Sequence, residues 1–376
     1  MSAGVRHLYV HLPFCAHRCG YCDFVTVVGR EGWHGRYVDA LLAELELVRG
    51  RLSDRVETVF LGGGTPTLTD GSELRRLLAA LPAASEVTVE ANPETVTPAL
   101  ARLLREAGVT RVSLGAQSFQ PGLLHVLERR ASPDAVRAAF YHLRDAKFDN
   151  VSLDLLHGIP GQSTAALEAD IDEALALAPE HVSYYELEAK PGTRFAHAHG
   201  AELARQAEAM EGYFELVVER LSAAGYRWYE TANFCLAADH VAGRDLRAQH
   251  NLAYWLGRDY LGLGIGAVST LGSERRRNTP RLNAYVSSLA RGEAPTREVE
   301  KLDELTRDQE RLMLGLRLDT GLPLAEAERS VDPAALGRVE RLGLATLRAD
   351  GDGQRTLVLT PRGRRLGGAV TVELLA

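Results

Sequence analysis

The first half of the chain alternates between two hydrophobic patterns. Short runs rich in β-branched and aromatic residues recur, and longer stretches whose apolar residues repeat every three or four positions lie between them. The short runs occupy residues 7–12, 56–62, 86–92, 110–116, 150–158 and 181–187, and the amphipathic stretches occupy 36–50, 72–81, 97–107, 133–146 and 164–177. Such alternation of strand and helix predicts a parallel sheet with right-handed crossovers. Six units favour a partial (β/α)6 barrel over the closed eight-stranded one.

The pattern changes after residue 195. One long helix is predicted over 202–224, followed by the strand-like "YRWYETANF" and the glycine-rich "YLGLGIGAVS". Farther on, predicted helices at 304–317, 323–329 and 333–342 precede a hairpin pattern in "LATLRADGDGQRTLVL", an order typical of winged-helix modules. We therefore expect an α/β chain in three parts, which are the barrel over 1–195, an accessory α+β region over 196–300 and a winged-helix-like module over 301–376.

Composition and charge narrow the class of protein. The 376 residues are 45% hydrophobic and 25% charged, which is typical of a globular protein with a substantial core. The net charge of -7 disfavours a chain whose main function is to bind phosphate backbones, so no nucleic-acid partner is expected. The N-terminus lacks the pattern of a secretory signal, and no apolar run reaches membrane-spanning length. We expect a cytoplasmic protein without a transmembrane segment.

Three of the four cysteines, Cys15, Cys19 and Cys22, form a C-x3-C-x2-C motif directly after the first predicted strand. Since cytoplasmic thiols stay reduced, such a cluster favours metal binding over disulfides. One interpretation is a zinc site to which a neighbouring His or Asp adds the fourth ligand. The other is a 4Fe-4S cluster held by three thiolates, which leaves one iron open to a substrate. Cys235 stands alone and is expected to be a buried free thiol.

The cysteine spacing at the end of a first strand resembles that of the radical S-adenosylmethionine (radical SAM) enzymes. In that family the open iron binds the amino and carboxylate groups of S-adenosylmethionine, and an electron from the cluster breaks a carbon–sulfur bond to give a 5'-deoxyadenosyl radical. A second motif, "GGGTP" from Gly62 to Pro66, ends the second strand. Its glycines allow the backbone to approach a ligand closely. In the family the equivalent stretch meets the methionine amino group, whereas in isolation it indicates only a tight turn.

Polar residues recur at the same end of later strands. Glu90 closes the third predicted strand, Gln117 follows the fourth and Asp154 lies in the fifth. Each of them alone is also typical of a capping or turn residue. Because the carboxyl ends of parallel strands meet at one rim, we expect these side chains to lie together beside the cysteines.

Several longer stretches resemble the oxygen-independent coproporphyrinogen III oxidase family. They are "HLYVHLPFC", "GGGTPT", "EANPETV", "GAQSF" and "SLDLLHGIPGQ". The resemblance implies that S-adenosylmethionine is surrounded by Tyr9, Gly63, Thr65, Glu90, Gln117, Arg129 and Asp154. Arg129 would pair with the carboxylate of the cofactor, a contact suited to a guanidinium, and Arg130 is its immediate neighbour.

Two local features distinguish the branches of that family, which holds several functions on one scaffold. The dehydrogenases place another cysteine two residues after the third, where this chain has Phe24. The haem chaperone branch, HemW, lacks that cysteine and carries H-N-x-x-Y-W, which matches "HNLAYW" from His250 to Trp255. A histidine beside two aromatic residues can offer an axial ligand and flat apolar surfaces to a porphyrin. The other interpretation of His250 is a satisfied histidine in an aromatic core.

The resemblance implies a HemW-like radical SAM protein. Cys15, Cys19 and Cys22 would hold a 4Fe-4S cluster, the barrel rim would hold S-adenosylmethionine, and His250 would contact haem. The implied partners are haem, haem-accepting proteins and an electron donor for the cluster. Two enzymatic functions stay open, namely oxidative decarboxylation of coproporphyrinogen III and radical-mediated methyl transfer.

Overall fold

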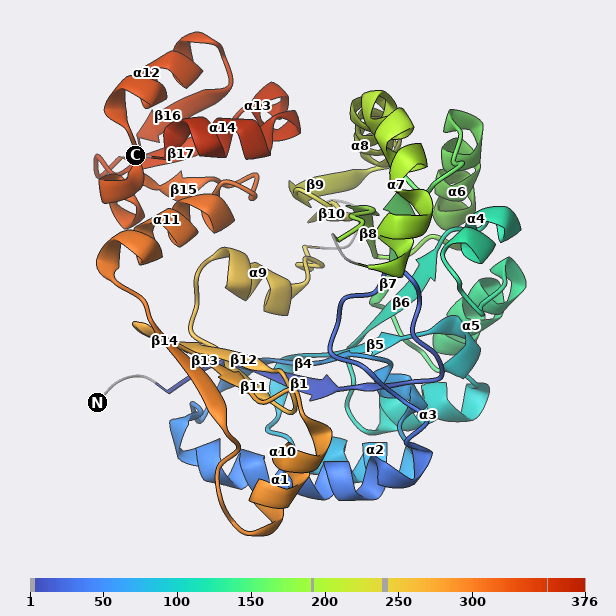
Figure 1. The fold of residues 1–376 in the computed structure, drawn as a ribbon. Helices are drawn as coiled ribbons and strands as arrows, with labels where there is room; N and C mark the ends of the chain where they lie inside the picture. The colour runs from blue at the N-terminus through green and yellow to red at the C-terminus, as the bar shows by residue number, and fades with distance from the viewer. Residues whose placement is uncertain (1–3, 191–192, 239–242, 350, 376) are drawn as a thin grey trace.

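A mostly parallel sheet organises the fold (Figure 1). In this computed structural model, which describes residues 4–190, 193–238, 243–349 and 351–375, nine strands join in the order β11-β1-β4-β5-β6-β7-β8-β10-β9. All neighbours from β11 to β8 are parallel, and β10 runs antiparallel to both β8 and β9. The six strands predicted in the first half are present as β1 (His7–Leu12), β4 (Val56–Gly63), β5 (Ala84–Ala91), β6 (Arg111–Gln117), β7 (Val151–His157) and β8 (His181–Glu186).

Helices follow these strands in turn, as the hydrophobic periodicity predicts. They are α1 (His34–Val48), α2 (Gly71–Ala80), α3 (Pro98–Glu106), α4 (Pro121–Val126), α5 (Pro133–Asp145) and α6 (Thr164–Leu177). Side-chain oxygens fix where four of them begin, because each accepts a backbone N–H of the first turn that has no partner within the helix. These N-cap residues are Asp70, Thr97, Ser132 and Ser163.

The region after residue 195 differs from its prediction in three elements. The long helix predicted over 202–224 is two helices, α7 (Arg194–Gln206) and α8 (Met210–Ala223), joined by a 3₁₀ turn. The strand-like run at 226–234 is a hairpin of β9 (Tyr226–Glu230) and β10 (Asn233–Leu236). The glycine-rich stretch contributes β11 (Leu261–Leu263), which pairs with β1. Segments beyond residue 195 therefore extend the central sheet, while the three-part division of the chain stays a prediction.

A buried carboxylate ties α1 to the segment after β11. Glu44 has no solvent exposure and accepts hydrogen bonds from Gly264 N–H, Asn278 Nδ2, Tyr285 OH and Arg297 Nη2. These donors lie on or beside a small antiparallel sheet, β12 (Val268–Leu271), β13 (Glu274–Asn278) and β14 (Arg297–Lys301), and the helix α10 (Leu282–Ala290), which packs against α1. A charge that is buried and fully hydrogen-bonded can position distant segments, because losing any donor leaves the carboxylate under-satisfied.

The C-terminal segment has its own apolar cluster, which extends from Leu312 to Leu374. Its helices and hairpin are α11 (Glu304–Gly315), α12 (Pro333–Arg341), β16 (Ala345–Ala349) and β17 (Arg355–Leu359). The helix predicted over 323–329 is wrong, because Leu322–Pro323 forms the short strand β15 beside β17 and two 3₁₀ turns follow. Two short helices after the hairpin, α13 (Pro361–Arg365) and α14 (Gly367–Leu374), were not predicted.

One short helix lies on the opposite side of the sheet from α1 and α2, between the sheet and the C-terminal segment (Figure 1). This is α9 (Gln249–Trp255), which contains His250. Glu86 accepts the backbone N–H groups of Gln249 and His250 at 3.0 Å each, so a carboxylate from β5 holds the first turn of α9. Within the described residues, none of the helices has the length and apolar character needed to cross a membrane.

Candidate cofactor site at the barrel rim

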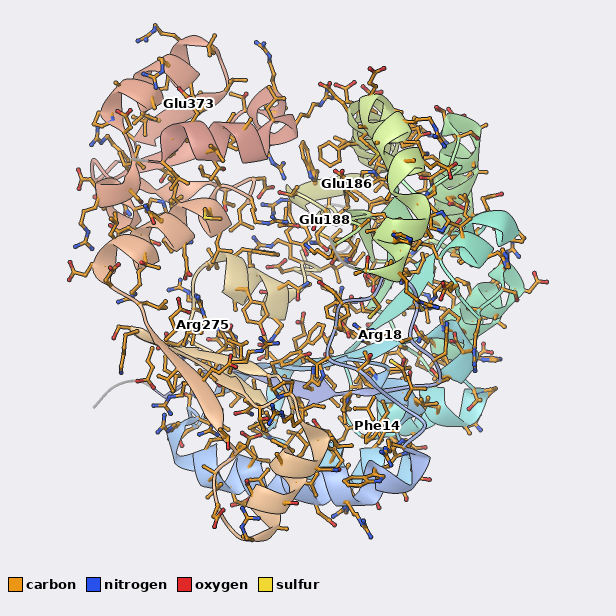
Figure 2. The ribbon with its side chains drawn as sticks, in the orientation of Figure 1. Phe14, Arg18, Glu186, Glu188, Arg275 and Glu373 are labelled. Carbon is orange, nitrogen blue, oxygen red and sulfur yellow. The ribbon has the colours of Figure 1, made fainter. Side chains whose placement is uncertain are left out.

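A cavity of about 490 Å³ opens at the carboxyl ends of the parallel strands. It brings together nine of the site residues predicted from the sequence. These lining residues are Cys15, Cys19, Cys22, Gly63, Thr65, Glu90, Gln117, Arg129 and Asp154. Two further predicted residues, Tyr9 and His250, are not part of the lining. Figure 2 shows Arg18 of the cysteine loop and, from β8 and the residues after it, Glu186 and Glu188, which line the same cavity.

The cysteine loop leaves β1 through a second short strand. Phe14–Cys15 (β2) pairs in parallel with Val27–Val28 (β3), so the loop between them returns to its starting point. The sulfur of Cys15 lies 3.6 Å from the hydroxyl oxygen of Thr65. Burial raises the pKa of the Cys15 and Cys19 thiols, and of the Cys22 thiol as well. Among the described residues, no group of three or more His, Cys, Asp or Glu side chains is arranged to hold a metal ion.

The glycine loop after β4 packs directly against the backbone that carries the cysteines. A Cβ atom on Gly64 would lie only 2.5 Å from the carbonyl oxygen of Pro13, which is closer than van der Waals contact allows. Gly63 has a φ of +114°, a conformation that favours glycine. Its N–H donates to Glu90 Oε2 at 3.0 Å. The motif therefore holds the cysteine loop close and connects it to β5.

Arg129 lines the cavity and has one buried donor without a partner among the described residues. Its Nη2 donates to Asn92 Oδ1 and to the carbonyl of Gly115, both at 2.9 Å, while its Nε is buried without a partner among the described residues. Asn92 also donates to Thr65 Oγ1 at 2.9 Å and so connects three strands of the rim. An orphaned guanidinium donor suits a carboxylate ligand. Asn92 was missed as a site residue, although the quoted motif "EANPETV" contains it.

Two carboxyl groups and a buried cation form the inner wall of the cavity. Burial raises the pKa of Glu90 to about 7, and the neighbouring Asp154 acts in the same direction. Burial also raises the pKa of Asp154, against the effects of Arg111 and of Ser113, whose hydroxyl donates to it. Arg111 is only 1% exposed, lines the cavity, and its Nε has no partner among the described residues. Arg111 was not predicted as a site residue, and its only signal in the sequence is a basic residue inside a strand pattern.

Gln117 ends β6 in an unusual backbone conformation. Its φ is +66°, in the left-handed region that non-glycine residues seldom adopt. The pairing of β6 with β7 shifts register between Gly115 and Gln117, as expected for a bulge. The bulge and the backbone strain coincide with the rim, where such features are typical of ligand sites.

Tyr9 lies next to the cavity rather than in its lining. Its hydroxyl is 2.9 Å from His11 Nδ1, and its ring stacks on Phe60 with a centroid distance of 6.1 Å. Phe60 does line the cavity. Tyr9 therefore supports the wall on which a ligand would rest.

His250 lies behind that wall with both ring nitrogens engaged. Nδ1 is 2.8 Å from Thr58 Oγ1 and Nε2 is 3.0 Å from the hydroxyl of Tyr254. The ring stacks on Phe60 at 5.1 Å, and the residue is 1% exposed. Burial, together with nearby His7, lowers the pKa of His250 to about 3, so the imidazole is neutral at pH 7.

Comparison with known proteins identifies the family. The radical SAM superfamily matches residues 9–174. The heme chaperone HemW of Mycobacterium tuberculosis (strain CDC 1551 / Oshkosh) is 39% identical, over 98% of this chain and 94% of that protein. The chain belongs to the HemW family of radical SAM proteins. The heme chaperone HemW of Bacillus subtilis (strain 168) is 32% identical over 97% of this chain and 98% of that relative.

A solved structure shares the fold of this HemW family member. Coproporphyrinogen III oxidase (HemN) from Escherichia coli, described as a radical SAM enzyme, superposes with a TM-score of 0.79 over 99% of this chain and 90% of that one. At 20% identity this likeness shows the fold alone.

Radical SAM membership implies a 4Fe-4S cluster and S-adenosylmethionine, and the donor types at the rim suit both, although the three sulfurs are not arranged around a metal position in the described chain. The cluster needs soft thiolate ligands, and three half-buried thiols lie on one loop that lines the cavity. The cofactor carries a carboxylate and an amino group, and the same cavity contains the orphaned Nε of Arg129 and the carboxyl group of Glu90.

Proposed function

We propose that this protein is a haem chaperone that carries a 4Fe-4S cluster and S-adenosylmethionine and transfers haem to acceptor proteins. The observation that carries the proposal is the 39% identity to the heme chaperone HemW, which extends over 98% of this chain. Phe24 also supports it, because it occupies the position where the dehydrogenases of the family place a further cysteine. Its side chain lines the cavity and is 63% exposed.

In this proposal some rim residues bind the cluster and others bind S-adenosylmethionine. Cys15, Cys19 and Cys22 ligate the cluster, and when bound it supplies one-electron chemistry. Arg129 pairs with the carboxylate of S-adenosylmethionine, while Glu90 and the glycine loop face its amino group. Thr65, Gln117 and Asp154 complete the lining, and Tyr9 supports it through Phe60.

Further parts of the proposal concern haem and the partners. His250 is the candidate haem contact indicated by the H-N-x-x-Y-W motif, and ligation there would require one of its two ring hydrogen bonds to open. We also propose a cytoplasmic location, an electron donor for the cluster and no nucleic-acid partner.

A haem titration tests the proposal. Anaerobically reconstituted protein is titrated with haem while the Soret band is followed, for wild type and for His250→Ala. Saturable one-to-one binding by the wild type supports a chaperone, and weaker binding by the variant places haem near the motif. Product analysis with coproporphyrinogen III, reductant and S-adenosylmethionine provides the second measurement. If the protein forms decarboxylated product and does not bind haem, its function is that of a dehydrogenase and not of a chaperone.

A further inference from the structure

A second cavity lies between the barrel and the C-terminal segment. This cleft measures about 570 Å³, a size typical of sites for small organic ligands. Its walls are α8, the turn between β9 and β10, α11 and the segment from α13 into α14. In Figure 1 α8 lies on one side of β9, and α13 and α14 lie on the other. Glu186 lines both this cleft and the cofactor cavity, so the two are adjacent.

One end of the cleft is built for an anion. Arg364 lines it with its guanidinium 3.6 Å from the centre of the Trp228 ring, and its Nη1 donates to the Trp228 carbonyl at 2.7 Å. Its Nη2 is buried without a partner among the described residues. No ion pair of Arg364 occurs in the part of the chain that the structure describes, and burial lowers its pKa to about 10. The adjacent Arg365 pairs with Glu215 at 2.5 Å, yet its Nε is also buried without a partner in the described chain. A desolvated cation with free donors is costly unless an anion pairs with it.

The start of α14 adds main-chain donors at the same end. Gly367 and Gly368 line the cleft, and the N-cap residue Leu366 provides no side-chain hydrogen bond to the first turn. The N–H groups of a first helical turn are good partners for a carboxylate.

The remaining lining mixes polar side chains, Glu186, Glu211 and Arg317 among them, with apolar residues that are partly exposed to solvent. Phe214 and Leu316 face the cleft, and three of its apolar residues are unusually open, with exposed fractions of 52% for Met313, 40% for Leu366 and 71% for Val372. A concentration of exposed apolar side chains beside an anion site is typical of a ligand with a flat apolar body and an anionic edge.

The cleft also contains atoms that bind haem iron in proteins. Met210, Met313 and His157 line the cleft, and their side chains are of the types that ligate haem iron. His157 is only 1% exposed, and its Nδ1 is buried without a partner in the described chain, so ligation there would require the side chain to turn into the cleft. Histidine and methionine are common axial ligands of haem. Burial lowers the pKa of His157 to about 4, so its imidazole is neutral at pH 7 and able to coordinate a metal.

We propose that this cleft is the haem site, with the porphyrin against Phe214, Leu316 and Val372 and its propionates at Arg364, Arg365 and the start of α14. The inference rests on the proposed function, since it locates the haem that a chaperone carries. It places haem in a cavity separate from S-adenosylmethionine, with Glu186 between the two ligands. His250 does not line this cleft and both of its ring nitrogens are engaged, so the inference replaces the motif-based assignment of His250 as the haem contact.

The test compares haem with its dimethyl ester, which keeps the macrocycle and iron but lacks free carboxylates. Both are titrated into reconstituted wild type, Arg364→Gln and Val372→Glu, with Leu342→Glu as the matched control. Leu342 is 59% exposed in the same C-terminal segment and lies outside the cleft lining. Because Val372 is 71% exposed, its replacement does not threaten folding.

Wild type is expected to bind haem about tenfold to a hundredfold more tightly than the ester, the range for a charge-assisted hydrogen bond. Arg364→Gln should lose most of that preference, and Val372→Glu should weaken both ligands while Leu342→Glu binds as wild type does. The inference is overturned if both cleft variants bind haem like wild type while His250→Ala does not, an outcome that leaves the proposed function standing. Absence of saturable binding by wild type would remove the proposed function as well.

Discussion

The orphaned donor of Arg129 provides the sharpest prediction for the cofactor site. Arg129→Gln removes the half-buried cation that lines the cavity and replaces it with a shorter neutral amide, which does not reach Asn92 and Gly115 as Nη2 does. A hydrogen bond to a charged group contributes about 1.5–3 kcal/mol. We therefore expect the Kd for S-adenosylmethionine to rise roughly tenfold to a hundredfold, since 1.4 kcal/mol is a factor of ten.

Equilibrium dialysis with labelled S-adenosylmethionine on anaerobically reconstituted protein measures this Kd, and iron and sulfide per chain verify that the cluster is intact. Arg130→Gln is the matched control, because Arg130 is the exposed neighbour of the half-buried Arg129 and does not line the cavity. Arg129→Lys should bind with intermediate strength, because it keeps the charge but loses the planar fork. Unchanged affinity in a fully loaded Arg129→Gln protein would refute the assignment, as would an equal loss in Arg130→Gln.

Three further predictions concern the architecture of the site. Gly64→Ala should reduce the iron and sulfide bound per chain, because the new methyl group meets the carbonyl of Pro13 beside the cysteine loop. The control Gly122→Ala, whose methyl group meets nothing within 4 Å, should bind as much iron and sulfide as wild type. Equal iron and sulfide contents in the two variants would contradict this prediction. Glu90 has a pKa of about 7 in the folded protein against an ordinary 4.5, so the unfolding free energy should fall as pH rises from 4.5 through 7. Urea titrations at pH 5 and pH 8 measure this fall. Between the two pH values the unfolding free energy of Glu90→Gln should fall by about 1–3 kcal/mol less than that of wild type. An equal fall in both proteins would refute the raised pKa of Glu90. Glu44→Gln should lower the unfolding free energy by about 2–4 kcal/mol in the same assay, because Glu44 is fully buried and its partly buried partner Arg297 loses its counter-charge. An unchanged urea midpoint would show that this ion pair is not stabilising.

The hydrophobic pattern predicted the six barrel strands because their apolar runs are long and their flanking helices are amphipathic. Predictions from the hydrophobic pattern were wrong or missing where the elements are short. β11 has only three residues, two of them leucines around a glycine, which is too few for a period to emerge. The apolar spacing at 323–329 is typical of a helix, yet Pro323 pairs within a strand against β17 and the chain then turns.

The candidate site was predicted unevenly for a similar reason. The position of each motif at the end of a predicted strand allowed the cysteines, the glycine loop and the rim carboxylates to be assigned to one site, since parallel strands end at a common edge. The structure places them in the lining of one cavity. Contacts between distant strands, such as Asn92 with Arg129, depend on side-chain geometry that a single sequence does not encode. A histidine beside aromatic residues has the same pattern whether it faces a ligand or satisfies a core, and the structure places His250 in a hydrogen-bonded core.

Transfer of haem tests the central claim most directly. Reconstituted protein is loaded with one equivalent of haem, freed of excess and mixed with a haem-free acceptor haemoprotein, while the Soret spectra of donor and acceptor are followed. A haem chaperone should load stoichiometrically and then pass its haem to the acceptor faster than it loses haem to buffer alone. A protein that takes up no haem, yet decarboxylates coproporphyrinogen III with reductant and S-adenosylmethionine, would contradict the claim.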